Sequence, residues 1–378
     1  MKIVLFESGT GGHRPTYLRR FAEALAPVSD VLLAVADETA AVLDDVPAEI
    51  ISLGPSPLER PGKSARQLFA AELESFHLAA GRADHAIHLF ADHLLRQLAF
   101  GPRAPSPTSL LVFYPRAHYP SEFGSRLSRS DQVVARTKDL VLGRWRRRRD
   151  ASSVWSLDER AAEIWAGRPG ATARWLPEPP VVGSPSSHGE RRGCVLYGAL
   201  THYKGIDRLE RAVAHDATGL RLTLAGYVER DFEHALTAHA AAIRKAGVDL
   251  DLRAHHHTEE AGLEVLSQAR CVVIPYHRHA GMSRVLLEAA VARTPVVVHR
   301  FGLLGHLTKR HEIGVAVDAD DPDALREAIL GFTTSEARTA SYEPALERFA
   351  ARHSSDAFAT ALREPLGLAS PAALESAR

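Results

Sequence analysis

Short apolar runs alternate with amphipathic segments through the first half of the chain. The first run spans residues 2–6 and passes into a glycine-rich turn. Apolar side chains then recur at helical spacing, at Tyr17, Leu18, Phe21 and Leu25. Further apolar runs at 31–36, 86–90 and 109–114 predict strands. A strand, a glycine turn, a helix and a second strand in this order are typical of a doubly wound α/β domain.

The alternation is interrupted between residues 176 and 193 and then restarts. This stretch, LPEPPVVGSPSSHGERRG, is rich in proline, serine and glycine and has no amphipathic period, as expected for an interdomain linker. After it, strands are predicted at 194–197, 221–225, 271–275, 295–298 and 315–317. Helices are predicted to begin at Ile206 and to span 283–292 and 322–330.

These patterns divide the chain into two similar α/β units. We predict an N-terminal Rossmann-like domain at 1–176, a linker at 177–192 and a second Rossmann-like domain at 193–340. Residues 341–378 are expected to form a C-terminal helix and a tail. Two doubly wound domains of this kind face a cleft, and ligands bind at the carboxyl ends of their strands. We therefore expect a nucleotide in the cleft.

The composition is that of an ordinary globular protein. Hydrophobic residues make up 45% of the chain and charged residues 24%, which excludes a disordered or fibrous protein. Lys+Arg and Asp+Glu both number 46, and this neutral balance argues against nucleic-acid binding along the whole chain. Cys194 and Cys271 lie in apolar runs, so we expect buried thiols in a reducing compartment.

The N-terminal sequence, MKIVLFESGTGGH, lacks the basic segment, long apolar run and cleavage site of a signal peptide. No run of eighteen apolar residues occurs, so we expect a cytoplasmic protein. A weak contact with the inner face of a membrane could use the basic run Arg144, Arg146, Arg147, Arg148 and Arg149. The alternative is that these arginines simply suit the solvent and the dipole at the end of a helix.

Three glycine-containing loops carry the candidate chemistry. The first, GTGGH at residues 9–13, follows a strand and precedes a helix. Gly11 and Gly12 allow close approach of the backbone to a ligand, and a helix N-terminus favours an anion or a polar oxygen. His13 and Glu7 are candidate acceptor-binding residues beside this loop. The alternative is a purely structural turn.

The second loop, YGALTHYKG at 197–205, places Gly198 at the end of a strand and Lys204 just before a helix. A lysine there can neutralise a diphosphate as a point charge, although a solvated loop lysine is the alternative.

The third loop begins at residue 275 and leads into a helix. Backbone amides at Gly281, Met282 and Ser283 could hold phosphate oxygens at the helix N-terminus. Glu288, one turn further on, could accept hydrogen bonds from two ribose hydroxyls. The alternative is a helix carboxylate paired with an arginine.

Together, Gly198, Lys204-Gly205, Glu288 and Thr294-Pro295-Val296 resemble the nucleotide-sugar glycosyltransferases of family four. The resemblance implies the GT-B fold, two Rossmann-like domains facing a cleft, with a terminal helix that crosses back to the first domain. It also implies transfer of a sugar from a nucleotide-diphosphate donor to a hydroxyl acceptor, with retention and without a metal or other cofactor. The resemblance further implies that Lys204 and the backbone amides of residues 281–283 contact the donor diphosphate. It implies that Glu288 binds the nucleotide ribose.

Two positions depart from the family pattern, and they keep alternatives open. Ala199 stands where the family often has an arginine, and Ala280 where it has a glutamate. Alternatives are therefore a GT-B sugar-nucleotide epimerase or hydrolase, and an inactive partner subunit that binds a sugar nucleotide. The GTGGH loop is also similar to that of the inverting N-acetylglucosaminyltransferase of peptidoglycan synthesis, which leaves inversion as a minor possibility. The acceptor could be a small molecule, a glycan or a lipid-linked compound.

The catalytic residues are expected in the first domain. The family resemblance implies a histidine near the transferred sugar, and His118, after a predicted strand, is our candidate. Asp92 is a further candidate as a general base. The run 255–257 contains three adjacent histidines, which cannot all face one ion in an extended loop, so we expect no metal site there.

Overall fold

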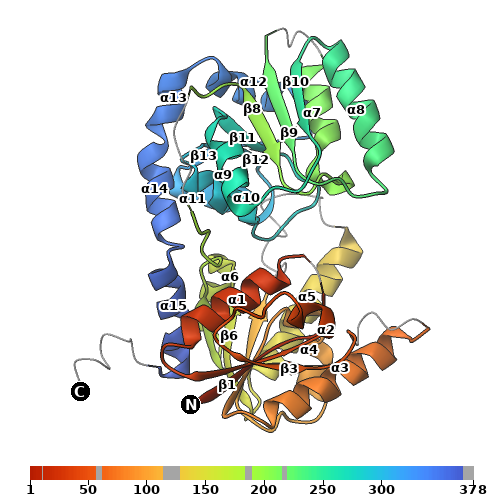
Figure 1. Cartoon of the computed structure of the whole chain (residues 1–378), viewed down its shortest axis with the longest axis vertical. Coiled ribbons are helices and arrows are strands. Elements are labelled where there is room, and N and C mark those ends of the chain that lie inside the picture. The colour runs from red at the N-terminus through yellow and green to blue at the C-terminus, as the bar shows by residue number, and fades with distance from the viewer. Residues whose placement is uncertain (11, 57–61, 114–127, 184–189, 215–218, 369–378) are drawn as a thin grey trace. The chain divides into compact units, whose positions relative to one another are not determined.

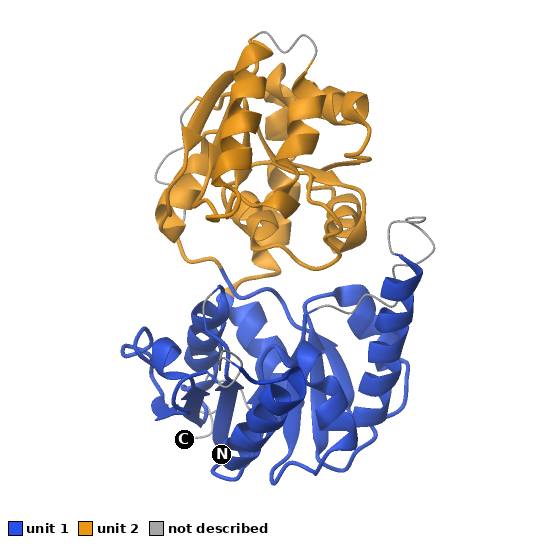
Figure 2. Ribbon diagram, turned by 90° about the vertical axis from the view of Figure 1, so that its right-hand side faces the viewer, with its two compact units in different colours: residues 1–120, 127–180, 355–378 blue, residues 121–126, 181–354 orange. Residues whose placement is uncertain are grey.

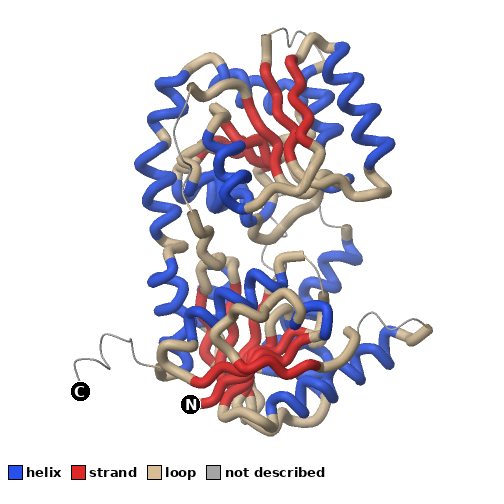
Figure 3. Tube along the Cα trace, in the orientation of Figure 1, coloured by secondary structure: helices blue, strands red, loops and turns tan. Residues whose placement is uncertain are grey.

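A computed structural model describes residues 1–378 except 11, 57–61, 114–127, 184–189, 215–218 and 369–378. The chain forms two compact units, coloured separately in Figure 2. The first unit comprises residues 1–120, 127–180 and 355–378, and the second comprises 121–126 and 181–354. Each unit is an α/β structure with its strands inside and helices around them (Figures 1 and 3).

The sheet of the first unit has, among the described residues, seven strands in the order β3-β2-β1-β4-β5-β6-β7, and every pairing is parallel. Its strands are β1 (Lys2–Glu7), β2 (Asp30–Val35), β3 (Glu49–Ser52), β4 (His85–His88), β5 (Thr108–Val112), β6 (Ala151–Ser156) and β7 (Thr172–Trp175). Its helices are α1 (Arg14–Leu25), α2 (Asp37–Ala40), α3 (Ala65–Ala80), α4 (Leu95–Phe100), α5 (Arg129–Trp145), α6 (Glu159–Ala166) and α15 (Ser355–Arg363).

The second unit repeats this plan. Its described sheet has six parallel strands in the order β10-β9-β8-β11-β12-β13. They are β8 (Cys194–Tyr197), β9 (Arg221–Ala225), β10 (Asp249–Arg253), β11 (Cys271–Ile274), β12 (Val296–His299) and β13 (Gly314–Val317). The helices are α7 (Ile206–Val213), α8 (Glu233–Lys245), α9 (Glu259–Ser267), α10 (Arg284–Val291), α11 (Gly302–His311), α12 (Pro322–Thr333), α13 (Glu336–Ser341) and α14 (Glu343–Ala351).

The hydrophobic pattern explains the central strands of both sheets. Residues 3–6 of β1 are fully buried, as are β11 and β12, because strands covered by helices on both faces must be apolar throughout. Helix α1 buries the predicted face and carries a proline in its first turn. Helix α12 begins where Asp321 caps the amides of residues 323 and 324. The predicted α/β fold is therefore confirmed, as is the burial of both cysteines as free thiols.

Two predicted elements differ in extent. Strand β4 ends at His88 rather than at residue 90, because Phe90 adopts a left-handed backbone conformation (φ 53°) that no strand accommodates. The C-terminal helix predicted within residues 341–378 is instead two helices: α14 ends at Ala351 and α15 begins at Ser355. Helix α14 belongs to the second unit and α15 to the first.

Helix α15 is fastened to the first unit by packing and hydrogen bonds. The rings of Phe358 and Phe21 meet edge to face, 5.3 Å between centroids. Arg363 donates to the carbonyl of Ala24 over 2.7 Å. Trp155, on β6, donates its indole N–H to the carbonyl of Ala361 over 3.2 Å. Within the described chain, no helix is both long and apolar enough to cross a membrane.

Candidate functional site

Two loops of the second unit meet at the carboxyl edge of its sheet. Gly198 follows β8 in a left-handed conformation (φ 102°), and a Cβ there would lie 3.1 Å from Nζ of Lys204. Gly205 is also left-handed (φ 76°), and a Cβ at that position would overlap the carbonyl of Pro275, just after β11. These glycines thus allow the loops after β8 and β11 to approach each other, and they start α7 at the sheet edge.

Lys204 is a buried cation. Its side chain is 4% exposed, and Nζ donates a hydrogen bond to the phenol oxygen of Tyr276 over 2.6 Å. The ammonium also lies 4.2 Å from the centroid of that ring. Burial holds the pKa of Lys204 below its usual value. Among the described residues no carboxylate lies within ion-pair distance of Nζ, so the position favours binding an anion.

The phenol of Tyr276 connects two of the predicted donor-binding residues. Besides accepting a hydrogen bond from Lys204, it lies close enough to the side chain of Ser283 to interact with it electrostatically. Ser283 is the N-cap residue of α10, and its side chain makes no capping bond to the helix amides. Met282 stands next to it, with its carbonyl 3.1 Å from Nε2 of His279, and Gly281 is buried. The predicted diphosphate residues 204 and 281–283 therefore lie together although they are about 80 residues apart.

Glu288 lies one turn into α10 and is largely buried. Oε1 of Glu288 is 3.5 Å from Nε of Arg284, which also pairs closely with Glu259. Burial raises the pKa of Glu288, while the positive charge of Arg284 opposes this rise. The alternative foreseen for this carboxylate, pairing with an arginine, is thus present in the structure. A carboxylate held at this distance still has hydrogen-bonding capacity for a ligand.

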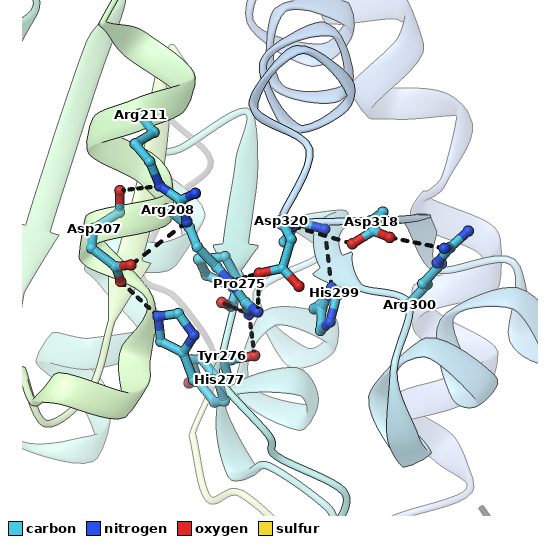
Figure 4. Close-up of polar contacts among 11 residues, drawn as sticks. Asp207, Arg208, Arg211, Pro275, Tyr276, His277, His299, Arg300, Asp318 and Asp320 are labelled. Carbon is cyan, nitrogen blue, oxygen red and sulfur yellow. Dashed lines mark hydrogen bonds and ion pairs between the residues drawn. The ribbon is translucent and has the colours of Figure 1, made fainter. Parts of the chain in front are cut away.

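An arginine that the sequence analysis did not identify braces this site. Arg208, on α7, is 4% exposed and donates to the carbonyls of Pro275 and Tyr276 over 2.8 and 2.6 Å. It also donates from Nε to Asp320 over 2.8 Å (Figure 4). On the same helix, Asp207 is hydrogen-bonded to the ring of His277. A charged residue on the otherwise apolar face of a predicted helix was the only sequence signal for Arg208.

A second group of polar residues lies at the carboxyl edge of the first sheet. Glu7 ends β1 and is 1% exposed; its Oε1 accepts from the amide of Gly9 over 2.7 Å and from Nε of Arg14 over 3.1 Å. Its Oε2 is buried without a hydrogen-bond partner among the described residues. Burial raises the pKa of Glu7 to about 7, against the opposing charge of Arg14.

A buried glutamate of α3 adjoins Glu7. Glu72 accepts from the hydroxyl of Ser8 over 2.7 Å, and its other oxygen is 2.7 Å from Nε2 of His93. Burial acts to raise the pKa of Glu72, but the hydrogen bond and charge of His93 hold it below its usual value, and the pKa of His93 is correspondingly raised. The fully buried His88 has its pKa lowered to about 4 by burial. The result is an ion pair, Glu72 with His93, beside the carboxyl group of Glu7, whose pKa is raised to about 7.

The remaining predicted residues of the first unit are placed as follows. Gly11 and His118 lie outside the described residues. Gly12 and His13 are exposed, with His13 as the N-cap residue of α1. Asp92 accepts a hydrogen bond from the amide of Phe113 over 2.8 Å, which fixes the end of β5 beside the turn after β4.

The predicted membrane-contact arginines divide into two groups. Arg146 is buried, contrary to its expected place on a basic surface, because it donates to the carbonyls of Trp165, Arg168 and Ala171. Arg148 likewise binds Asp150 and backbone carbonyls of the loop after α4. Both guanidinium groups are already hydrogen-bonded to backbone carbonyls near the ends of α6 and α4, so they are not available to bind lipid. Exposed cations remain at Arg144, Arg147 and Arg149.

One cluster among the described residues has the side-chain types of a metal site. Ligand atoms of His299, Asp318 and Asp320 lie within 4.8 Å of one another. However, Asp318 is paired with Arg300 over 2.8 Å, Asp320 is paired with Arg208, and Nδ1 of His299 accepts from the amide of Ala319 (Figure 4). The arginines already neutralise both carboxylates, so the donor set fits a structural network better than a cation site.

Comparisons with known proteins agree with this arrangement. Residues 185–348 match the family model described as Glycosyl transferases group 1. A search of curated proteins found no match. Among solved structures, Anabaena Alr3699/HepE in complex with UDP and glucose is 16% identical with a TM-score of 0.70, and the match covers 97% of this chain and 99% of that one.

Two trehalose-phosphate structures are similar over the same length. An E. coli trehalose-6-phosphate structure bound with UDP-2-fluoro glucose is 13% identical (TM-score 0.67), with 97% and 99% of the two chains covered. The α,α-trehalose 6-phosphate synthase from Burkholderia multivorans is 12% identical (TM-score 0.68), with 100% and 99% covered. At these identities the likeness establishes the fold, which is GT-B. The match of residues 185–348 to the group 1 model supports a glycosyltransferase enzyme.

Proposed function

We propose that this protein transfers a sugar from a nucleotide-diphosphate donor to a hydroxyl group of an acceptor, with retention of configuration and without a metal, as the resemblance to family four implies. Lys204 and the residues 281–283 bind the donor diphosphate, Gly198 leaves room for it, and Glu288 binds the ribose. The observation that carries the proposal is the buried ammonium of Lys204, which has a phenol as its hydrogen-bond partner and, among the described residues, no carboxylate within ion-pair distance. The charge of Glu288 acts on this ammonium only from beyond ion-pair distance, so an anionic ligand would supply a close countercharge.

The acceptor, in this proposal, binds to the first unit. Glu7 and His13 flank the glycine loop after β1, and Glu7 offers an acceptor hydroxyl a buried oxygen that has no hydrogen-bond partner among the described residues. His118 and Asp92 are the proposed catalytic residues. In a retaining reaction without a covalent nucleophile, the leaving phosphate can receive the acceptor proton, so the protein groups mainly position substrates and stabilise developing charge.

A uridine diphosphate sugar is the first donor to test. Anabaena HepE is described with UDP and glucose, and the E. coli structure with UDP-2-fluoro glucose. Both share the fold of this chain, and the proposal extends their donor class to it. The exposed Arg144, Arg147 and Arg149 remain as proposed contacts for an acidic or membrane-bound acceptor.

The test is thermal stability of the purified protein with UDP, GDP, ADP, dTDP and CDP. A ligand present at one hundred times its Kd adds about 2.7 kcal/mol of stability, which is readily measured. We expect one diphosphate to stand out and Lys204→Ala to reduce its stabilising effect strongly, whereas the exposed control Lys245→Ala retains it. A flat response to all five would contradict the donor site. Donor breakdown that needs no acceptor would instead favour the hydrolase alternative.

A further inference from the structure

Tyr276 has more than one connection to the proposed donor site. Its side chain is only 3% exposed, at the carboxyl end of β11. At the tip of that side chain, the phenol oxygen accepts a hydrogen bond from Lys204 over 2.6 Å, and it interacts electrostatically with the nearby Ser283. Lys204 and Ser283 come from different loops of the second unit, so the phenol oxygen lies between the two parts of the proposed diphosphate site.

The base of the same residue is fixed as well. Arg208 donates to the carbonyl of Tyr276 over 2.6 Å and to the carbonyl of Pro275 over 2.8 Å (Figure 4). The guanidinium is in turn held by Asp320. A planar guanidinium with several simultaneous acceptors has little rotational freedom. The backbone of Tyr276 is therefore anchored to α7, the helix that begins directly after Lys204-Gly205.

We propose that Tyr276 is a positioning residue for donor binding: its phenol fixes the ammonium of Lys204, beside Ser283, where it meets the diphosphate. This inference rests on the proposed function. A flexible lysine loses side-chain entropy when it binds a phosphate, and a lysine that is already held in place loses less. The hydrogen bond to Tyr276 therefore strengthens donor binding without any contact between tyrosine and donor.

The aromatic ring of Tyr276 also contacts the ammonium of Lys204. The Lys204 ammonium lies 4.2 Å from the centroid of Tyr276, within the range of a cation–π contact, and 5.5 Å from that of Tyr203. Replacing Tyr276 by phenylalanine keeps this ring and removes only the hydroxyl. The substitution thus separates the hydrogen bond from the packing of the core.

The experiment is a double-mutant cycle read out as the Kd of the nucleoside diphosphate that stabilises the wild-type protein. We expect Tyr276→Phe to weaken binding about tenfold, the scale of a lost hydrogen bond to a charged group. In a Lys204→Ala background the same change should have almost no further effect, because its target is absent. The control Tyr227→Phe, at an exposed tyrosine of the same unit, should leave Kd unchanged in both backgrounds.

Steady-state kinetics distinguish a positioning role of Tyr276 from a purely structural one. With a donor sugar, Tyr276→Phe should raise KM for the donor and change kcat less, and Ser283→Ala should lower affinity in the same direction. Unaltered Kd in Tyr276→Phe, or losses that simply add in the double variant, would overturn the positioning role. Failure of the wild-type protein to bind any nucleoside diphosphate is a separate result, which would remove the proposed function itself.

Discussion

Glu7 and Arg14 are paired through only one of the two carboxylate oxygens. Nε of Arg14 donates to Oε1 over 3.1 Å, whereas Oε2 is buried and has no hydrogen-bond partner among the described residues. Arg14 remains partly exposed, so its charge is shared with solvent. A buried carboxylate with incomplete compensation holds its proton more tightly, and the pKa of Glu7 rises from 4.5 to about 7. This gives the end of β1 a titratable group near neutral pH.

The first prediction concerns the stability cost of that group. Between pH 4.5 and 7 the unfolded chain has released the Glu7 proton while the folded chain keeps it, so this residue lowers stability as the pH rises through that window. The total cost is about 3 kcal/mol above pH 7, on the order of 1.4 kcal/mol per pKa unit. Glu7→Gln should therefore be more stable than the wild type at pH 8 and nearly equal to it at pH 4.5.

Urea unfolding at pH 4.5, 6 and 8 measures this difference. Glu74→Gln, at an exposed position of α3, is the matched control and should show no such pH dependence. A Glu7→Gln protein that is equally destabilised at every pH would show that the carboxyl contributes through packing rather than through its proton.

Removing Glu288 should weaken nucleotide binding. If its carboxylate accepts ribose hydroxyls, Glu288→Ala costs about 1–3 kcal/mol in binding free energy, the scale of hydrogen bonds to a charged group. Folding should be little affected, because Arg284 keeps Glu259 as a partner. Calorimetric titration with the preferred diphosphate measures the change, with Glu327→Ala, exposed on α12, as the control. Wild-type affinity in Glu288→Ala would remove this residue from the ribose site.

Arg208→Lys is expected to destabilise the second unit although it conserves charge. A lysine ammonium cannot reach the two carbonyls and Asp320 in the geometry of a guanidinium, so buried acceptors lose their donors. We expect a loss of about 2–4 kcal/mol, near the range for breaking a buried ionic network. Arg211→Lys, whose side chain is exposed on the same helix, should change stability by less than about 0.5 kcal/mol. Equal effects of the two substitutions in urea unfolding would contradict the bracing role.

Metal removal should leave turnover unchanged. The ammonium of Lys204 is the proposed countercharge for the diphosphate. Asp318 and Asp320, the carboxylates of the cluster that resembles a metal site, are both paired with arginines. Sugar transfer measured with and without EDTA tests this. Activity that disappears with EDTA and returns with Mg²⁺ or Mn²⁺ would show that a divalent cation carries part of the charge.

Local sequence patterns predicted those structural features that depend on residues close together in the chain. Central strands such as β1 and β11 are recognisable because both faces are buried and the run is continuously apolar. Strand β10 was not predicted: it lies at the sheet edge, and its sequence, DLDLR, mixes charged and apolar residues in a half-buried strand. Lys204 and Ser283 could be found because glycine loops and helix starts leave a sequence signature.

Contacts between distant segments could not be read in this way. Tyr276 joins Lys204 across 72 residues, and Arg208 reaches Asp320 across 112. Glu72 lies on a helix 64 residues from Ser8, and nothing in its own surroundings distinguishes it from a surface glutamate. The fold, which brings the carboxyl ends of neighbouring strands together, is what makes these residues part of a site.

The ion pair of Glu72 and His93 should give a stability maximum between the pKa values of the unfolded groups. The lowered pKa of Glu72 contributes stability above about pH 4.5 that is lost on acidification, and the raised pKa of His93 contributes stability below about pH 6.5 that is lost as the pH rises through its folded value. His93→Gln should therefore cost about 1–3 kcal/mol near pH 5.5 and less at pH 9. Urea unfolding across this range measures the difference, with the exposed His234→Gln as control. A cost that does not change with pH would mean that His93 acts as a neutral hydrogen-bonding residue. The measurement is best made in a Glu7→Gln background. Otherwise the titration of Glu7, which lowers stability as the pH rises from 4.5 to 7, would overlap with the effect of His93.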